Sequence, residues 1–242
     1  MFPPKEFALP FIKKQQEAKD VYSFYFDQTH TDFSFIPGNW IRVTLNLPSP
    51  DQRGNSRSFS IASSPLQKDI LMITTKISQS VFKQTLYSLT PRDAVQFFGP
   101  VGRFLLNEEE TQPHILLAGG IGITPFHSML SYAHKKKLTI PLTLFASFAT
   151  VEDMMYYHEL QALENEYIKI IYTITQPAKS LGQWHGETGR ISEEMIKKYV
   201  TDPLASLYYI VGPGVMVSTM EEMVKEMHIP QEQIRKETFV GY

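Results

Sequence analysis

The hydrophobic pattern of the chain changes near residue 110, and this change constrains the fold more than any other feature. Before it, short segments alternate apolar and polar residues between proline and glycine clusters. Such a pattern is typical of antiparallel strands in a small barrel. After it, continuous apolar segments alternate with helical ones, as in a parallel sheet with helices on both faces. We therefore predict an antiparallel β-barrel domain over residues 1–110 and an α/β parallel-sheet domain over residues 111–242.

The two halves also differ in how helices are distributed. A single helix interrupts the strands of the first half, and Ser80 stands where its side chain can cap that helix. In the second half, strand and helix patterns alternate four times. The expected strands cover 20–27, 39–47, 69–77, 94–100, 114–120, 141–148, 168–175 and 207–213, and the expected helices cover 81–89, 124–137, 154–167, 192–200 and 214–227.

Composition excludes several classes of protein. A formal net charge of -2 argues against a nucleic-acid partner, which normally requires a basic face. The chain has no cysteine, so disulfides, cysteine-ligated metals and a thiol nucleophile are excluded. No apolar segment approaches the roughly 20 residues of a membrane helix, and the N-terminus lacks a signal-peptide pattern. We expect a cytoplasmic protein with no membrane span.

Histidine and methionine are the remaining candidates for metal ligation, and their spacing favours other roles. The seven histidines lack metal-ligand spacing, and we interpret His127, His134 and His158 as exposed helical residues. Several methionines recur at helical spacing, which core packing explains better than a soft-metal site. We predict no metal site. The methionines in question are Met216, Met220, Met223 and Met227.

Residues 57–65, "RSFSIASSP", are unusual for a strand. Alternation places Arg57 and Phe59 on one face and Ser58 and Ser60 on the other. A second unusual feature is the glycine at three strand ends of the second half, where ligands bind in open parallel sheets. The segment "GGIGITP" is not the dinucleotide fingerprint GxGxxG, because Pro125 stands where the third glycine would be. Glycines at such turns are equally explained by the tightness of the turn.

Together, four motifs carry a resemblance to a known family. They are "RSFS", "GPVGRF", "GGIGITP" and "VGPGVM", and they occur in the order and with the spacing found in the ferredoxin–NADP reductase family. The terminal "ETFVGY" is similar to the ending of that family. The chain resembles the family from about residue 6 to Tyr242. The resemblance implies that the barrel binds FAD and that the α/β domain binds NADH or NADPH.

The resemblance assigns the flavin motif to the barrel. It implies that Arg57 contacts the FAD pyrophosphate, that Phe59 packs on the isoalloxazine ring, and that Ser60, next to Ser58, reaches the flavin N5 edge. A forked cation suits a diphosphate and an aromatic ring suits a flat apolar one. The alternative is an edge strand with a surface arginine. The pyrophosphate loop of the family falls on "SQSVFK", which adds Ser80, Phe82 and Lys83, although Lys83 is equally an ordinary solvated lysine.

The resemblance also implies a nicotinamide slot. Thr124 and the turns of the α/β domain would shape it, while Glu237 would hydrogen-bond near the ring edge or assist proton transfer. Phe239 would shield the flavin, or would instead fill the seam between the domains. Val211 replaces the usual cysteine of the family, which puts efficiency in doubt more than activity. The glycines and proline of the slot are Gly120, Gly122, Gly212 and Pro213.

The implied reaction is hydride transfer from a nicotinamide cofactor to FAD, with electrons passing to a separate acceptor. Ferredoxin, flavodoxin, an oxygenase component, free flavin and ferric chelates all remain open as acceptors. We expect NADH to be preferred, because Thr175 and Gln176 stand where NADPH users carry a serine–arginine pair and only Lys179 offers a cation nearby. Tyr156 and Tyr157 would contact adenine or simply pack. The competing hypothesis is a nucleotide- and flavin-binding regulatory module that has lost turnover.

Overall fold

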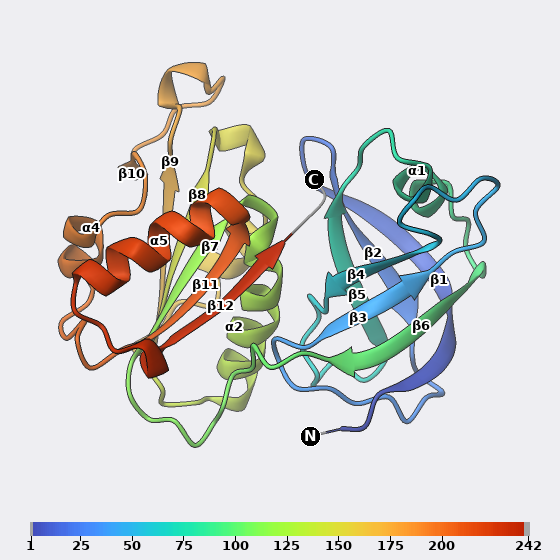
Figure 1. Ribbon diagram of the computed structural model, residues 1–242, viewed down its shortest axis with the longest axis horizontal. Coiled ribbons are helices and arrows are strands. Elements are labelled where there is room, and N and C mark those ends of the chain that lie inside the picture. Colours follow the sequence, from blue (N-terminus) through green and yellow to red (C-terminus); the bar gives the residue numbers. More distant parts are fainter. Residues whose placement is uncertain (1, 240–242) are drawn as a thin grey trace.

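The first half of the chain folds as an antiparallel barrel. The computed structural model describes residues 2–239, and Figure 1 shows the barrel beside a second, parallel sheet. The six barrel strands are ordered β4-β3-β6-β1-β2-β5, and a bridge between Ile61 and Ile73 joins the two edges. The predicted barrel is confirmed. Its strands are β1 (Lys5–Ala18), β2 (Val21–Asp27), β3 (Trp40–Thr44), β4 (Ser56–Ser60), β5 (Ile70–Lys76) and β6 (Ala94–Val101), with helix α1 (Val81–Tyr87) after β5.

Strand β1 is the barrel element that sequence reasoning missed. Its first half pairs with β6 and its second half pairs with β2, with irregular register near Phe11 and between Gln16 and Ala18. Half of its residues are exposed, including consecutive polar ones, so a strict period of two is lost. Inside the barrel, aromatic rings fill the core, and those of Phe26 and Phe97 lie 4.9 Å apart.

The second half forms a parallel sheet ordered β10-β9-β8-β7-β11-β12. All five strand pairs are parallel. The strand order reverses between β7 and β11, and open α/β sheets bind ligands beyond the strand ends at such a point. The strands are β7 (His114–Gly119), β8 (Leu142–Phe148), β9 (Ile168–Ile174), β10 (Glu187–Thr188), β11 (Leu207–Pro213) and β12 (Ile234–Phe239).

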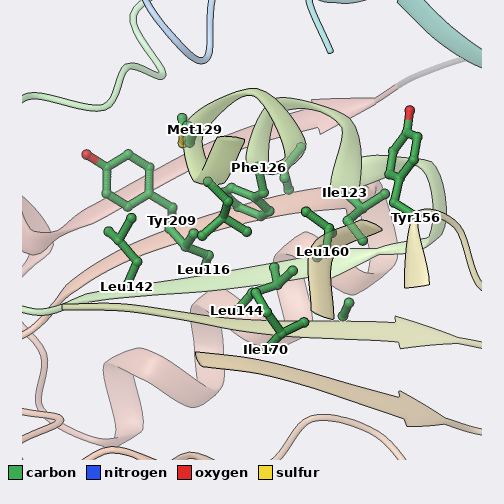
Figure 2. Close-up of a cluster of buried hydrophobic side chains, with 14 of the residues drawn as sticks. Leu116, Ile123, Phe126, Met129, Leu142, Leu144, Tyr156, Leu160, Ile170 and Tyr209 are labelled. Carbon is green, nitrogen blue, oxygen red and sulfur yellow. The ribbon is translucent and has the colours of Figure 1, made fainter. Parts of the chain in front are cut away.

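Helices cover both faces of this sheet, as predicted. Leu116 and Ala118 of β7 face one apolar cluster, and Ile115 and Leu117 face another. Figure 2 shows the first cluster, in which Phe126 and Met129 pack over the strands. Helices α2 (Thr124–Lys136) and α3 (Tyr157–Gln161) contribute to the first cluster, and α4 (Glu193–Tyr199) and α5 (Gly214–Glu226) contribute to the second. The second cluster also holds Met220 and Met227.

Two helical expectations were wrong. The helix expected over 154–167 is only α3, because Tyr156 has a left-handed backbone with φ 56° and the Asn165 side chain accepts the backbone N–H groups of Tyr167 and Ile168. His134 and His158 are exposed as expected, but His127 is buried, with 3% of its surface exposed. Its helix face packs against the barrel instead of solvent.

Buried hydrogen bonds join the two domains. His127 Nδ1 lies 2.7 Å from the carbonyl oxygen of Ala62, and the Ser128 hydroxyl donates to the carbonyl of Ser63 at 2.7 Å. Each pair joins α2 to the segment after β4. Because unpaired buried polar groups are costly, these bonds fix one arrangement of α2 on the barrel. Across residues 2–239, the helices are all too short or too polar to cross a bilayer.

Candidate cofactor site between the two domains

A cavity of about 560 Å³ lies between the barrel and the parallel sheet, and both contribute to its lining. The barrel provides β3, β4, β5 and the start of α1, while the α/β domain provides the start of α2 and the end of β12. Eight of the residues singled out from the sequence lie in this lining. They are Arg57, Ser58, Phe59, Ser60, Lys83, Thr124, Glu237 and Phe239.

Arg57 is held by its own loop at the cavity wall. One guanidinium nitrogen donates to both carboxylate oxygens of Asp51 at 2.7 Å, and the other donates to the carbonyls of Arg53, Gly54 and Ser56. Hydrogen bonding to Arg57 lowers the pKa of Asp51. The arginine is therefore pre-positioned at the cavity, and a bound anion would share it with Asp51.

Helix α1 places a second cation beside Arg57. The Ser80 hydroxyl caps the helix by accepting the backbone N–H of Lys83 at 3.3 Å, as predicted. The Lys83 ammonium donates to the Thr75 hydroxyl and lies 4.9 Å from the centre of the Phe59 ring. Burial, with smaller contributions from Arg57 and Arg53, lowers the pKa of Lys83 to about 8. The reading of Lys83 as an ordinary solvated lysine is therefore wrong.

Phe82 and Ser80 lie beside the cavity and are not part of its lining. Phe82 is fully buried in the barrel core and stacks on Phe59, with ring centres 6.0 Å apart. Phe59 itself is only 8% exposed. The two rings therefore form a stiff apolar floor, of which Phe59 faces the cavity.

Three further polar groups line the cavity, Ser60 from the barrel and Thr124 and Glu237 from the α/β domain. The Ser60 hydroxyl and one oxygen of Glu237 are buried and have no hydrogen-bond partner among the described residues. Burial raises the pKa of Glu237 to about 7. Thr124 is buried and donates its hydroxyl to the carbonyl of Ile121 at 3.0 Å. Unpaired buried polar atoms are rare in proteins, so Ser60 and Glu237 are fitted to a polar ligand.

The predicted turn residues of the parallel sheet lie next to the cavity without lining it. A side chain at Gly122 would come within 2.4 Å of the Val211 carbonyl oxygen, so glycine is required there by backbone contact. Gly120 has a left-handed backbone with φ +51°, and a Cβ atom added there would meet no atom within 4 Å. Glycine is therefore favoured at this position by its backbone conformation and not by crowding. In the β11–β12 register, Val211 lies opposite Glu237 and Pro213 lies opposite Phe239.

Phe239 ends β12 and is half-buried between the cavity and the core of the α/β domain. Gly212 precedes Pro213 at the end of β11, where this strand meets α5. Residues 240–242, including the Tyr242 of the quoted ending, lie outside the described residues. Thr175 and Gln176 directly follow β9, as the argument about nucleotide preference requires.

Sequence reasoning missed other lining residues, notably Trp40, Arg42 and Arg53. A signal was available for the first two. In the β3–β4 register, Trp40 lies opposite Ser60 and Arg42 opposite Ser58, so they share the face of the serines. Alternation within "NWIRV" predicts this face, but the pairing of the two strands had to be known. The other missed residues are Ser56, Thr74, Thr75, Lys76, Ile77, Ser78, Ile121 and Thr238.

The charges of the lining fit a nucleotide diphosphate. Five cationic side chains line the cavity, against one carboxylate, Glu237. Arg57 and Lys83 lie at the barrel end, whereas Glu237 lies at the end of β12. A diphosphate suits the cationic side chains, and a flat heterocycle suits the Phe59 ring and the polar groups of Ser60, Thr124 and Glu237. The residues present therefore fit FAD.

Comparisons with known proteins agree with this geometry. Residues 8–105 match the family profile of an oxidoreductase FAD-binding domain, and residues 116–222 match that of an oxidoreductase NAD-binding domain. The chain belongs to the ferredoxin–NADP reductase family. It is 27% identical to ferredoxin–NADP reductase B of Sorangium cellulosum over 215 residues, which cover 86% of each chain. The predicted cofactors of this family, FAD and NAD(P)H, are thereby confirmed.

Other members of the family carry the same unit within larger chains. The chain is 25% identical to the flavohemoprotein of Bacillus subtilis over 237 residues, which cover 95% of this chain and 59% of that one. Its fold matches the flavohem-like FAD/NAD-binding domain of nitric oxide dioxygenase from Vibrio cholerae with a TM-score of 0.84 at 16% identity, covering 96% and 98% of the two chains. The chain thus spans less than two thirds of the flavohemoprotein that it matches.

Proposed function

We propose that the protein is an FAD-dependent NADH oxidoreductase that passes electrons to a separate acceptor. The single observation that carries this proposal is the shared cavity, in which the flavin motif of the barrel meets Thr124 and Glu237 of the nucleotide domain. A protein that only bound both nucleotides would not need one cleft for both. When bound, FAD supplies the two-electron chemistry that the side chains of the protein lack.

The residues of the cavity have distinct roles in this proposal. Arg57 and Lys83 bind the diphosphate, Phe59 supports the flavin ring, and Ser60 hydrogen-bonds at its N5 edge. Thr124 and the turns at Gly122 and Gly212 shape the nicotinamide slot. Their shared task is to hold two rings with the reacting atoms about 3–3.5 Å apart and to exclude water. Glu237 holds or transfers a proton beside the ring edge, and Phe239 shields the flavin.

NADH is the proposed donor, because the turn after β9 offers Thr175 and Gln176 where a 2′-phosphate would need a forked cation. The acceptor is proposed by class only, as a separate protein or small molecule. A regulatory module without turnover is the competing function, and the Val211 substitution is its only support.

Anaerobic titration of the FAD-loaded protein with NADH tests the proposal. One equivalent of NADH should bleach the flavin absorbance, and steady-state turnover should follow with ferredoxin, flavodoxin, free flavin and ferric chelates as a panel. A protein that binds FAD but is not reduced by either NADH or NADPH is a regulatory module. Failure to retain FAD at all would refute the assignment of the cavity.

A further inference from the structure

A second cavity, of about 840 Å³, lies on the other side of the interface between the domains. The barrel contributes Gln15 and Glu17 of β1, and the α/β domain contributes the loops after β8 and β9, including Tyr156 and Trp184. Strands β2 and β5 lie between β1 and β4 across the closed sheet, because β5 bridges to the end of β4. The two cavities are therefore separated by one pair of strands.

A row of hydroxyl groups crosses this pair of strands. Ser23 of β2 and Thr74 of β5 lie directly opposite each other in register, and their hydroxyl oxygens are 2.7 Å apart. Both residues are buried, and Thr74 also lines the cofactor cavity. The antiparallel bridge from Ile61 to Ile73 places Ser60 opposite Thr74. Residues opposite each other share a face of the sheet, so Ser60 lies beside Thr74 on the cofactor side, with no hydrogen bond between the two hydroxyls.

Glu17 continues the row toward the second cavity. The β1–β2 register shifts between Gln16 and Ala18, so Glu17 is the extra residue of a bulge, a feature that redirects side chains. The carboxyl of Glu17 receives a hydrogen bond from the Ser23 hydroxyl and lines the second cavity. Burial raises the pKa of Glu17, and the bond from Ser23 partly offsets that rise.

When Glu17 is ionised, the donors and acceptors of this row take one direction. An ionised Glu17 only accepts, so Ser23 donates to it and must accept from Thr74. The Tyr156 hydroxyl donates to Thr74 at 2.5 Å from the other domain, and burial raises the pKa of this phenol far above its ordinary value. Figure 2 shows the Tyr156 hydroxyl directed away from its own apolar cluster. Thr74 therefore donates to Ser23 and keeps one lone pair free on the side of Ser60.

We propose that Thr74, Ser23 and Glu17 form a proton relay that connects the cofactor cavity, where Thr74 lies opposite Ser60, with the second cavity. The inference rests on the proposed function. Oxidation of one NADH to NAD⁺ releases two electrons and one proton. When the electrons leave one at a time to an acceptor that binds no proton, that proton must leave the cofactor cavity. The relay carries it from Thr74 through Ser23 to Glu17, and from Glu17 into the second cavity.

The structure also shows why a purely structural role explains this row less well. Strand β5 is otherwise apolar between Ile70 and Ile73, and an apolar pair in place of Ser23 and Thr74 would need no buried partners. The Ser60 hydroxyl has no partner among the described residues, whereas a structural bond would satisfy it. Glu237 faces the cofactor cavity from the opposite wall and offers a separate proton acceptor, so loss of the relay slows the protein without inactivating it.

The first test needs no cofactor. The pKa of the Glu17 carboxyl is measured in the apoprotein by ¹³C NMR, with Glu17→Gln used to assign the resonance. Ser23→Ala should raise this pKa because it removes a donor to the carboxylate. Thr74→Val should raise it less, although Thr74 does not contact Glu17. Other groups that influence the Glu17 carboxyl remain in every variant; these are Tyr25, Glu159, His127 and Lys13. A Glu17 pKa that Thr74→Val leaves unchanged would overturn the relay.

The second test separates electron input from proton output. In the FAD-loaded protein, Ser23→Ala should leave the rate of reduction by NADH unchanged, because Ser23 does not line the cofactor cavity. Thr74→Val, which changes the lining, is compared with it in the oxidation step alone. Oxidation by ferricyanide, which accepts an electron and no proton, should slow by about tenfold or more, since positioned proton transfer contributes factors of 10²–10⁴. The solvent deuterium isotope effect on this step should rise. Thr74→Ser keeps the hydroxyl and should restore both values.

A matched control lies on neighbouring strands. Thr44 and Ser56 form a cross-strand hydroxyl pair at 2.8 Å, and Thr44 does not line the cofactor cavity. Thr44→Val should change neither the Glu17 pKa nor the oxidation rate; a slowing equal to that of Thr74→Val would assign the effect to general loosening of the barrel. If the protein is not reduced by NADH, the proposed function fails and the apoprotein titration still decides whether the row is coupled. If reduction occurs and ferricyanide oxidation is unaffected, the relay alone is refuted.

Discussion

The protonation of Glu237 should make the stability of the apoprotein depend on pH. Glu237 lies on β12 with one carboxylate oxygen buried and unpartnered among the described residues. Burial is the cause that raises its pKa, from an ordinary 4.5 to about 7. The folded protein therefore holds this proton up to about pH 7, whereas the unfolded chain loses it near pH 4.5. The contribution to stability is complete below pH 4.5 and is lost as the pH rises through 7.

The size of this loss follows from the two pKa values. Each unit of difference corresponds to about 1.4 kcal/mol, so the free energy of unfolding should fall by about 2–3 kcal/mol between pH 4.5 and pH 8 because of this group. Glutamine at position 237 has a similar shape and does not titrate. Glu237→Gln should therefore remove that part of the pH dependence and stabilise the apoprotein most at pH 8.

Urea unfolding of the apoprotein at pH 5 and pH 8 provides the measurement. The difference between the two pH values is compared for wild type and Glu237→Gln, so that groups common to both proteins cancel. Glu232→Gln, which changes an exposed carboxyl in the preceding turn, is the matched control and should behave as wild type. Equal pH dependence in wild type and Glu237→Gln would refute the reasoning and would mean that water or a cation reaches this carboxylate.

Four further variants test other parts of the site. Arg57→Ala should weaken FAD binding by about 10- to 100-fold, because a charge-assisted contact contributes about 1.5–3 kcal/mol; flavin retention equal to wild type through dialysis would contradict this. Gln176→Arg should shift kcat/KM toward NADPH by about tenfold by supplying a forked cation, and an unchanged preference would mean that the turn is misplaced. Phe239→Ala should lower KM and kcat together because nicotinamide no longer displaces a ring; a large fall in Tm with KM unchanged would assign Phe239 to the seam. Glu159→Gln should bring the pKa of His127 below its ordinary value, since burial lowers it and Glu159 now raises it, which imidazole NMR titration of the apoprotein measures.

The sequence predicts the elements with a regular period and the site residues that lie on them. In the α/β domain, strands β7, β8, β9 and β11 and helices α2, α4 and α5 follow from apolar runs between turn signals, whereas β10 and β12 were not expected. The capping role of Ser80 follows from its position before an apolar helical pattern. The face shared by Ser58 and Ser60 follows from alternation alone. Ser58 and Ser60 meet Thr124 and Glu237 only because the two domains pack against each other, and no local sequence pattern predicts that packing.

The expectations that failed depend on long-range contacts. His127 lies on a helix whose pattern predicts an exposed histidine, but the barrel covers it and Glu159 lies 3.0 Å from its ring. Tyr156 interrupts the expected helix because its hydroxyl reaches Thr74 in the other domain. In both cases the interface between the domains overrides a local preference. A histidine or tyrosine that bonds across an interface has the same sequence signature as one on a solvated helix.

The interface between the two domains, where predictions from local sequence failed, also positions the two sides of the cofactor cavity. Ser128 and His127 of α2 bond to the segment directly after Ser60, and α2 begins at Thr124. The barrel side and the α/β side of the cofactor cavity are therefore joined by short buried bonds and not only by the linker between the domains. Because an error of 1 Å between reacting atoms costs about 10²-fold in rate, a sliding apolar interface would be a poor support for this chemistry. Polar bonds with defined geometry fix the register of the two walls, and this accounts for buried serine, histidine and tyrosine where apolar residues would seal the interface equally well.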